Sequence, residues 1–475
     1  MGPNPPFIGR DLELEALRGM LNGSEPRVAT LYGRRRIGKS FLIETAFAGQ
    51  PTLTIEGVEN RPKREQIANF LFHLSVYAGQ PVTTGSPATT WRKAFHALFE
   101  QIRQKPCIII LDEFQWMANY RSEIVSELKV AWDRHLSKVN GAGLVLCGSI
   151  ASFMIGKVIR SSAFYGRIDT VIHLKPFELT ETAKLLTGRG VEEVLEAHML
   201  TGGVPKYLRL LSKEPSVRLG LVNLAFRESG FLTEEYGRIF AGHFGRNPEF
   251  EAITGALAHQ SYGLTRPQIE QVTGTPKGGG LSTHLADLEA AGFISSQTPF
   301  CRKSDTRIVK YFLSDAYLRF YYAFIKPALK DIKAGTNPER FNQVWTTPAY
   351  LAWRGRSFEY LCVQHARRIA DLLQFSGISF TCGPYFQSPA RDKDGAQIDL
   401  VFDRADHVLT LCEMKYSTSA PGRSIIEETE RKANVLRAKF PRKTVQPVLI
   451  SLTPPSSDLA SAGYFVRTIL AEELI

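Results

Sequence analysis

The stretch that decides the fold is Gly33-Arg34-Arg35-Arg36-Ile37-Gly38-Lys39-Ser40, which matches the pattern GxxxxGK[ST]. It follows an apolar run at Val28–Tyr32, typical of a buried strand, and it opens a predicted helix at Lys39–Phe47. The glycines leave backbone N–H groups open to phosphate oxygens, and the helix points the positive end of its dipole at the same anion. Lys39 would neutralise the β- and γ-phosphates, and the Ser40 hydroxyl would bind Mg²⁺. The sequence therefore predicts a P-loop for ATP or GTP.

The loop itself supplies a set of candidate nucleotide-binding residues, namely Gly33, Arg36, Ile37, Gly38, Lys39 and Ser40. The arginine run Arg34–Arg36 either faces the phosphates or is solvated, and we favour solvation. The strand–loop–helix setting argues against a chance match to the pattern.

A second motif, Asp112-Glu113, follows the apolar run Cys107–Leu111. A strand that ends in two carboxylates is a Walker B pattern, in which Asp112 holds Mg²⁺ through water and Glu113 polarises the attacking water. The alternative is a pair of solvated acids at a strand end. Because a P-loop precedes them, the two carboxylates indicate hydrolysis rather than passive binding.

The N-terminal part of the chain alternates between apolar runs and helical patterns. The predicted strands are Val28–Tyr32, Thr52–Glu56, Cys107–Leu111, Leu144–Cys147 and Thr170–Leu174. The predicted helices between them are Lys39–Phe47, Lys63–Ala78, Trp91–Gln104 and Ser122–Leu136. Such alternation predicts an α/β fold with a parallel sheet covered on both faces.

The length of 475 residues predicts several domains. We expect a P-loop ATPase core at residues 1–175, a helical lid at 176–246, a winged helix-turn-helix at 247–327, a linker at 328–352 and a small α/β domain at 353–475. The winged helix rests on predicted helices at Phe250–Gln260, Arg266–Val272 and Leu281–Ala291, and on a hairpin formed by Phe293–Ser295 and Val309–Leu313.

The N-terminal motifs resemble those of a known family. Phe7-Ile8-Gly9-Arg10 and Glu13-Leu14, then the P-loop, Leu111–Phe114 and Leu146–Ser149, resemble AAA-type ATPases of the archaeal and bacterial group related to origin-recognition and STAND proteins. The resemblance covers residues 7 to about 240. It implies adenine as the base, with Gly9 and Arg10 lining its pocket, and Ser149 as the polar residue that senses the γ-phosphate. The alternatives are a loop turn for Gly9-Arg10 and a satisfied strand-end hydroxyl for Ser149.

The same resemblance implies two further nucleotide contacts. Tyr165-Gly166-Arg167 resembles the arginine-bearing segment of the group, so Arg167 is a candidate γ-phosphate contact, in cis or from a neighbouring copy. Thr201-Gly202-Gly203-Val204-Pro205 resembles the GGxP element that closes on the nucleotide from the lid, with Pro205 as its candidate. The alternatives are a surface ion pair for Arg167 and a helix-start turn at Pro205.

The C-terminal part carries a second cluster of charged residues. Asp399 lies in the apolar run Ile398–Phe402, and Glu413 and Lys415 lie in the next predicted strand. Residues two apart in a strand face the same way, so Glu413 and Lys415 project together and Asp399 can join them from the neighbouring strand. Two carboxylates suit Mg²⁺ or Mn²⁺, and a lysine can orient water and stabilise a charged transition state.

This arrangement resembles the PD-(D/E)xK nuclease fold, matched by Asp399, Glu413 and Lys415. Glu359 sits early in the preceding predicted helix, Arg356–Leu373, where many members place a further acidic ligand. The candidate metal ligands are therefore Ser40 and Asp112 at one site, and Glu359, Asp399 and Glu413 at the other. A cross-strand salt-bridge cluster, or a nuclease fold that cleaves poorly, explains the same residues.

The middle segment and the net charge suggest DNA as a partner. Lys plus Arg exceed Asp plus Glu by 58 to 47, a formal charge of +11 that attracts polyanions. Candidate contacts at the recognition helix are Lys277, Ser282, Thr283 and His284, and those in the wing are Arg302, Lys303, Arg307 and Lys310. The alternative is a winged fold that acts as a spacer.

The remaining features favour a cytoplasmic protein without a membrane partner. No apolar run reaches the roughly 18–20 residues of a membrane span, and the N-terminus lacks an export signal. The scattered cysteines form no CxxC pair and are expected to be reduced core residues, with a zinc site as the weaker alternative. A homo-oligomer or a protein partner stays open.

The leading hypothesis is an ATP-hydrolysing AAA-type ATPase that acts on DNA, with a metal-dependent nuclease-like C-terminal domain. The alternative is a STAND-like ATP/ADP switch that binds DNA or protein and has a non-cleaving C-terminal domain. An antiviral or toxin–antitoxin effector overlaps with the first hypothesis.

Overall fold

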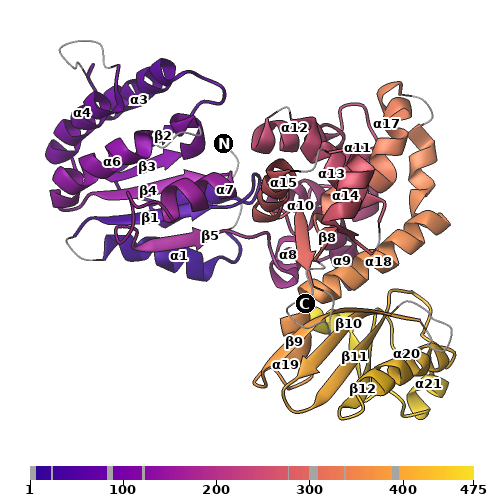
Figure 1. Cartoon of the computed structure of the whole chain (residues 1–475). Coiled ribbons are helices and arrows are strands. Elements are labelled where there is room, and N and C mark those ends of the chain that lie inside the picture. The colour runs from indigo at the N-terminus through magenta and orange to yellow at the C-terminus, as the bar shows by residue number, and fades with distance from the viewer. Residues whose placement is uncertain are drawn as a thin grey trace. The chain divides into compact units, whose positions relative to one another are not determined.

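The structure is a computed structural model (Figure 1) that describes residues 7–22, 25–82, 89–119, 123–245, 247–260, 262–275, 278–298, 309–335, 338–387 and 395–475. It divides into two compact units, one of Met1–Pro176 with Leu285–Ala291 and one of Phe177–His284 with Gly292–Ile475. No helix in these described ranges has the length and apolarity needed to cross a membrane.

The first unit is built on a parallel sheet with the strand order β2-β3-β4-β1-β5 (Figure 1). Its strands are β1 (Arg27–Tyr32), β2 (Thr52–Glu56), β3 (Ile108–Asp112), β4 (Gly143–Gly148) and β5 (Thr170–His173). These bounds lie within one residue of the predicted strands. The central strands are buried on both faces, which explains their continuous apolar runs.

Helices cover both faces of this sheet. They are α1 (Asp11–Arg18), α2 (Lys39–Ala46), α3 (Lys63–Ala78), α4 (Trp91–Gln104), α5 (Phe114–Ala118) and α6 (Glu123–Arg134). Leu17 of α1 and Leu42 of α2 pack in one core cluster, whereas α3, α4 and α6 contribute to another. The period-2 alternation of a strand is visible in β1, where Val28 belongs to the second cluster and Ala29 to the first.

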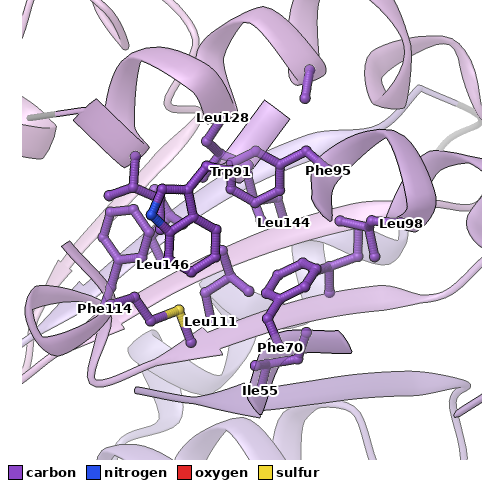
Figure 2. Packing of buried hydrophobic residues seen from close by; sticks show 14 of the residues in the cluster. Ile55, Phe70, Trp91, Phe95, Leu98, Leu111, Phe114, Leu128, Leu144 and Leu146 are labelled. Carbon is purple, nitrogen blue, oxygen red and sulfur yellow. The ribbon is translucent and has the colours of Figure 1, made fainter. Parts of the chain in front are cut away.

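The larger core cluster is aromatic at its centre (Figure 2). The ring of Phe70 on α3 meets the rings of Trp91 and Phe95 on α4 edge-on, at centroid distances of 5.8 Å and 5.6 Å. Each such side chain contributes about 1.5–3 kcal/mol by leaving water. This packing fixes β3, and with it the carboxylates at its end.

The second unit begins with the predicted helical segment. Its helices are α8 (Leu179–Leu185), α9 (Val191–Thr201), α10 (Pro205–Leu211), α11 (Val217–Ala225) and α12 (Phe231–Phe244). The next elements are α13 (Pro248–Ala258), β6 (Leu264–Thr265), α14 (Arg266–Thr273), α15 (Gly279–Ala290), β7 (Ile294–Gln297) and β8 (Lys310–Leu313). The strands form an antiparallel sheet in the order β6-β8-β7, so the predicted hairpin gains the short strand β6.

The segment expected to be a linker, residues 328–352, is helical instead. It is occupied by α17 (Lys326–Lys333), the 3₁₀-helix Pro338–Thr346 and the start of α18 (Pro348–Gln364), and α16 (Ala316–Phe320) precedes it. Gly335, Pro338 and Pro348 suggested a linker, but Pro338 begins the 3₁₀-helix and Pro348 begins α18, where a missing N–H costs nothing. The linker prediction was therefore wrong.

The C-terminal sheet has the order β13-β12-β11-β10-β9. Its strands are β9 (Phe380–Gln387), β10 (Ala396–Arg404), β11 (Val408–Lys415), β12 (Thr444–Ser451) and β13 (Arg467–Leu470). β9, β10 and β11 run antiparallel, and β11, β12 and β13 run parallel. The helices of this part are α18, α19 (Ala366–Leu372), α20 (Ile425–Lys439) and α21 (Ser457–Ser461), so the predicted single helix Arg356–Leu373 is broken near His365.

A register shift interrupts the pairing of β10 with β9 between Ile398 and Val401. Ile398 and Val401 pack in the cluster that includes α20, whereas Leu400 and Phe402 pack in the cluster that includes α18. The bulge thus places Asp399 at the point where the strand changes faces, a device that re-aims side chains.

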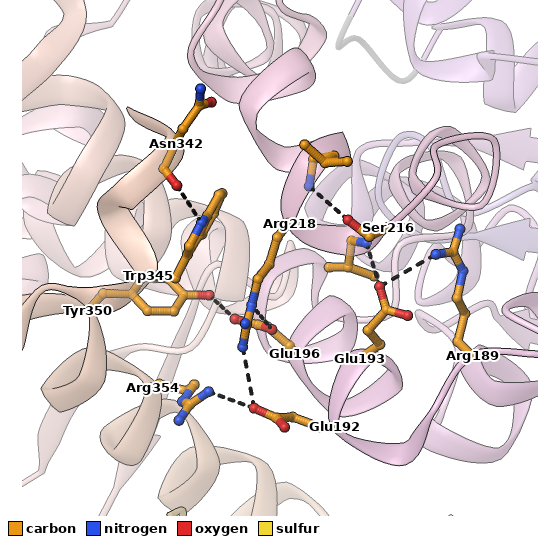
Figure 3. A network of polar contacts seen from close by, with 12 residues as sticks. Arg189, Glu192, Glu193, Glu196, Ser216, Arg218, Asn342, Trp345, Tyr350 and Arg354 are labelled. Atoms are coloured by element: carbon orange, nitrogen blue, oxygen red, sulfur yellow. Dashed lines mark hydrogen bonds and ion pairs between the residues drawn. The ribbon is translucent and has the colours of Figure 1, made fainter. Parts of the chain in front are cut away.

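Helix α9 is joined to α18 by buried polar contacts (Figure 3). The Tyr350 hydroxyl donates to Glu196, and Arg354 donates to Glu192 at 2.9 Å. Arg218 bridges the two glutamates, at 3.3 Å from Glu196 and 3.4 Å from Glu192. The lid helices and the C-terminal sheet, predicted as separate domains, therefore lie in one compact unit.

Candidate functional site

The P-loop connects β1 to α2 as the sequence predicts. Gly33 has φ 153° and Gly38 has φ 90°, which is backbone space that favours glycine. A Cβ at Gly33 would lie 2.3 Å from the Leu174 carbonyl oxygen, so only glycine fits there. The side chain of Ile37 is 2% exposed and packs in the core, so it anchors the loop to the sheet.

Lys39 and Ser40 open helix α2 inside this loop. The buried Lys39 ammonium donates to the carbonyl oxygens of Gly33 at 2.9 Å and Arg34 at 3.2 Å. The Ser40 hydroxyl donates to Asp112 Oδ2 at 3.0 Å. A hydroxyl and a carboxylate next to a P-loop are oxygen ligands that suit Mg²⁺.

The three arginines of the loop differ from the expectation of a solvated run. Arg34 is buried, Arg35 lies 3.4 Å from Glu59, and only Arg36 is exposed. Arg36 also has φ 75°, which is uncommon for a residue with a side chain. Solvation was therefore wrong for Arg34.

Glu113 lies at the centre of a polar cluster next to Asp112. Its Oε2 accepts hydrogen bonds from the Ser149 hydroxyl at 2.7 Å and from the Gln115 amide. Burial raises the pKa of Glu113, but Lys39 and these two hydrogen bonds outweigh it, so the net pKa lies below the usual value. The carboxyl is therefore ionised at neutral pH, as a group that accepts or orients a proton of water must be.

Ser149 and Gln115 hold Glu113 together. Ser149 is 1% exposed at the end of β4, and the Gln115 amide donates to its hydroxyl at 3.1 Å. The structure thus brings Ser149, which the family resemblance selected, to the Walker B acid. Gln115 was not predicted, because a glutamine after an acidic pair carries no distinctive spacing.

The other residues suggested by the resemblance have clear structural contacts. Gly9 and Arg10 have φ 62° and 64° and form the turn before α1, and Arg10 donates to the Lys175 carbonyl. Arg167 binds Asp133 through two nitrogens, at 2.6 Å and 2.9 Å. This ion pair corresponds to the alternative stated for Arg167, a surface ion pair in place of a γ-phosphate contact.

The GGxP element forms the turn between α9 and α10. Gly202 and Gly203 have φ 62° and 71°, and a Cβ at Gly203 would lie 2.0 Å from the Phe177 carbonyl oxygen. Pro205 takes the first turn of α10. These contacts account for the element as a helix-start turn, and a nucleotide contact by Pro205 stays a prediction.

The predicted C-terminal cluster forms on β10, β11, α18 and α20. Glu413 is 4% exposed, and its two carboxylate oxygens accept from Lys415 and Lys432, each at 2.8 Å. Glu428 on α20 lies 2.9 Å from Lys432 and 3.6 Å from Lys415. Burial lowers the pKa of both lysines, but these ion pairs outweigh it and raise both values.

Glu359 and Asp399 add two partly buried carboxylates, and the charges of Arg356, Lys415 and Lys432 act on them. Neither forms an ion pair with another described residue, and Asp399 accepts a hydrogen bond from Gln397 at 3.1 Å. Burial, reinforced by Asp399, raises the pKa of Glu359 to about 7. Burial also raises the pKa of Asp399, and Glu413 adds to this rise. Glu359, Asp399 and Glu413 therefore sense one another's charge.

The residue types of this cluster suit a divalent metal, but their arrangement in the structure is not that of a metal site. Carboxylate oxygens are the ligands of Mg²⁺ and Mn²⁺. Within the described ranges, however, no three His, Cys, Asp or Glu side chains are arranged as a metal-binding group. Glu359 also lies in the second half of α18 (Pro348–Gln364), not early in its helix as predicted.

Lys432 was missed by the sequence interpretation. It lies on the buried stripe of α20, with Ile425, Thr429 and Leu436 at helical spacing. A lysine on such a stripe needs a carboxylate partner in the core. That position could have identified it as a member of the cluster.

Only some of the residues predicted to contact DNA in the middle segment lie within the described ranges. Lys277, Arg302, Lys303 and Arg307 lie outside the described residues. Lys310 donates to the Tyr262 carbonyl at 3.0 Å and lies 5.1 Å from the Phe386 ring centroid. His284 Nδ1 lies 2.8 Å from a Glu249 oxygen, and Ser282 and Thr283 are exposed on α15.

Comparison with known families identifies the N-terminal part. Residues 7–211 match the model of a family described as an ATPase domain predominantly from Archaea. In these residues the chain is similar to an archaeal-type ATPase domain. The match covers the P-loop, Asp112, Glu113 and Ser149, and it includes helices α8 and α9 of the second unit.

Similar proteins extend beyond the ATPase domain. An uncharacterized protein of Methanocaldococcus jannaschii is 27% identical over 337 residues, which are 69% of this chain and 71% of that protein. The ORC1-type DNA replication protein 1 of Haloarcula marismortui is 24% identical over 274 residues, 54% of this chain and 63% of that protein. A Walker-type ATPase of Pyrococcus abyssi has 18% identity and a TM-score of 0.48, and the match covers 66% of this chain and 96% of that one.

Proposed function

We propose that the protein is an ATP-hydrolysing, DNA-acting ATPase whose C-terminal domain is a metal-dependent nuclease of the PD-(D/E)xK kind. The observation that supports this proposal is that Glu359, Asp399 and Glu413, from α18, β10 and β11, act on one another's pKa while Lys415 pairs with Glu413. The neighbouring carboxylates raise one another's pKa, and a divalent cation is a ligand that would relieve this repulsion.

At the nucleotide site, each residue has a part that its geometry supports. Lys39 and the loop amides bind the phosphates of ATP, and Ser40 and Asp112 hold Mg²⁺. Glu113, kept ionised by its neighbours, orients the attacking water. Ser149 couples that carboxylate to the end of β4, where the γ-phosphate is read.

At the C-terminal site, Asp399 and Glu413 are the proposed metal ligands, with Glu359 as a further one. A bound cation would take over the charge that Lys415 and Lys432 now balance at Glu413. Lys415, the more exposed of the two lysines, would then orient water and stabilise the developing negative charge.

DNA is the proposed substrate for three reasons. The formal charge is +11, which favours binding to polyanions. The helices α13, α14 and α15 with the sheet β6-β8-β7 have the element order of a winged helix-turn-helix. One relative, from Haloarcula marismortui, is an ORC1-type DNA replication protein.

A plasmid-cleavage assay tests the nuclease proposal. Supercoiled DNA is incubated with the parent protein, Lys415→Ala and the matched control Lys443→Ala, with Mg²⁺ or Mn²⁺. Lys443 pairs with Asp403 in the same sheet domain and lies outside the cluster. We expect nicking by the parent and the control and its loss in Lys415→Ala. Equal nicking by all three would remove the cluster from the reaction.

A second candidate function is a STAND-like ATP/ADP switch that binds DNA or protein without cutting. The specific observation in its favour is that both oxygens of Glu413 are occupied by lysines, as in a structural salt-bridge cluster. ATP hydrolysis without cleavage under any metal condition would favour it.

A further inference from the structure

A cavity of about 380 Å³ lies in the second unit beside α18. Its walls come from the C-terminal end of α13, from the end of β8, from α16 to the start of α17, and from α18. The volume is within the roughly 300–1,000 Å³ of small-molecule sites. Its lining combines apolar side chains with the cationic side chains of Arg319 and Arg356.

Arg319 is the residue that marks this cavity as a binding site. Its Nε and Nη1 atoms are buried and have no hydrogen-bond partner in the described part of the chain. Its guanidinium lies 4.0 Å above the centre of the Tyr360 ring, which fixes its plane. A buried donor without an acceptor is costly, so the site favours an added acceptor.

The hydroxyl of Tyr322, another polar group of the lining, already has hydrogen-bond partners. The Tyr322 hydroxyl lies 2.8 Å from the Tyr236 hydroxyl and 3.0 Å from the Thr254 hydroxyl. The exposed Arg356 is a second cation on the wall, one helical turn before Tyr360. Two guanidinium groups on the wall of one cavity favour an anion, and guanidinium geometry suits phosphate oxygens.

The cavity lies beside the helix that carries one of the proposed metal ligands. Tyr360 lines the cavity, contacts Arg319 through its ring and directly follows Glu359 on α18.

We propose that this cavity binds a phosphate group of a nucleic-acid strand, with Arg319 and Arg356 as its cationic contacts. The strand passes from there to the carboxylates of the C-terminal domain. The nucleic-acid source rests on the proposed function, whereas the preference for a phosphate rests on the two arginines and the cavity alone. A free phosphate ester would satisfy the same contacts.

The test compares Arg319→Gln and Arg356→Gln with the control Arg238→Gln, an exposed arginine that lies 3.9 Å from Glu234. Binding of a fluorescein-labelled oligothymidylate and of thymidine monophosphate is measured without ATP or divalent metal. We expect each cavity variant to bind the oligonucleotide about tenfold more weakly, in line with loss of a charge-assisted hydrogen bond. The control should change binding far less. Because Arg356 is exposed, its variant keeps the test independent of folding.

Unchanged binding of both the oligonucleotide and the mononucleotide in both cavity variants would overturn the proposal. Weaker binding of the mononucleotide with unchanged oligonucleotide binding would overturn the nucleic-acid source. Cavity-dependent oligonucleotide binding by a protein that never nicks plasmid DNA would support the cavity and contradict the nuclease. If nicking requires Lys415 but oligonucleotide binding is the same in both arginine variants as in the parent, the cavity proposal is contradicted and the nuclease proposal is not.

Discussion

At the residue scale, Glu113 shows how the fold holds a reactive group. Its backbone has φ 45° and ψ 46°, the left-handed region that residues with a side chain rarely occupy. Such a conformation costs on the order of 1–3 kcal/mol and persists where the surroundings determine it. Here the Glu113 carboxylate is held by hydrogen bonds from Ser149 and Gln115 and by the charge of Lys39.

Replacement of Glu113 by glutamine tests its role. Glutamine keeps the shape and cannot accept a proton, so we expect Glu113→Gln to bind ATP and to hydrolyse it about 10²–10⁴-fold more slowly. The measurement is steady-state phosphate release beside nucleotide binding. Glu65→Gln, an exposed residue on α3 that pairs with Arg61, is the control. A normal rate in Glu113→Gln would place the base elsewhere.

Single residues with a fixed motif could be predicted from sequence, and their supporting partners could not. Lys39, Ser40 and Asp112 meet as expected because the P-loop and Walker B spacing encode their contacts. Gln115 depends on the left-handed turn at Glu113, which no local pattern announces.

At the scale of elements, the contact between α9 and α18 is a buried polar network. Removing the Tyr350 hydroxyl leaves Glu196 with the charge of Arg218 and one fewer donor. We expect Tyr350→Phe to lower the free energy of unfolding by about 1–3 kcal/mol, measured by urea denaturation. Tyr165→Phe, at an exposed tyrosine, should leave it unchanged. Equal midpoints for the two variants would show that the network contributes nothing.

A buried histidine on α9 makes stability depend on pH. Burial lowers the pKa of His198 from 6.5 to about 3, and its Nδ1 lies 2.8 Å from the Thr182 hydroxyl. The unfolded chain therefore takes up the proton first as pH falls. The contribution of neutral His198 to the free energy of unfolding is complete above pH 6.5. It is lost as the pH falls toward 3, by up to about 1.4 kcal/mol per pH unit.

The variant His198→Gln should flatten this dependence between pH 6.5 and pH 4. Burial lowers the pKa of His365 as well, so part of the slope should remain. Urea unfolding at a series of pH values gives the slope, and His259→Gln on the surface is the control. A slope as steep in His198→Gln as in the parent would contradict the assignment.

Elements with strong periodicity were predicted closely, whereas those set by tertiary context were not. Lys63–Ala78 and Trp91–Gln104 match their helices residue for residue. The expected linker failed because Pro338 and Pro348 begin helices there. The bulge beside Asp399 arises from strand pairing, which a single strand's sequence does not contain.

At the scale of the whole molecule, the ATP site and the carboxylate cluster belong to different compact units. The family match nevertheless runs through α8 and α9, and α9 shares its core and its ion pairs with α18. α18 in turn carries Glu359. A shift of α9 would therefore act on α18 through packed side chains and ion pairs.

The most direct test of this account is plasmid cleavage measured with and without ATP, in the parent and in Lys39→Ala. Lys39→Ala removes the cation that faces the nucleotide phosphates and leaves the C-terminal cluster intact. We predict Mg²⁺- or Mn²⁺-dependent nicking that ATP changes in the parent and leaves unaffected in Lys39→Ala. Nicking that is the same with and without ATP in both proteins, or no nicking while ATP is hydrolysed normally, would contradict the account.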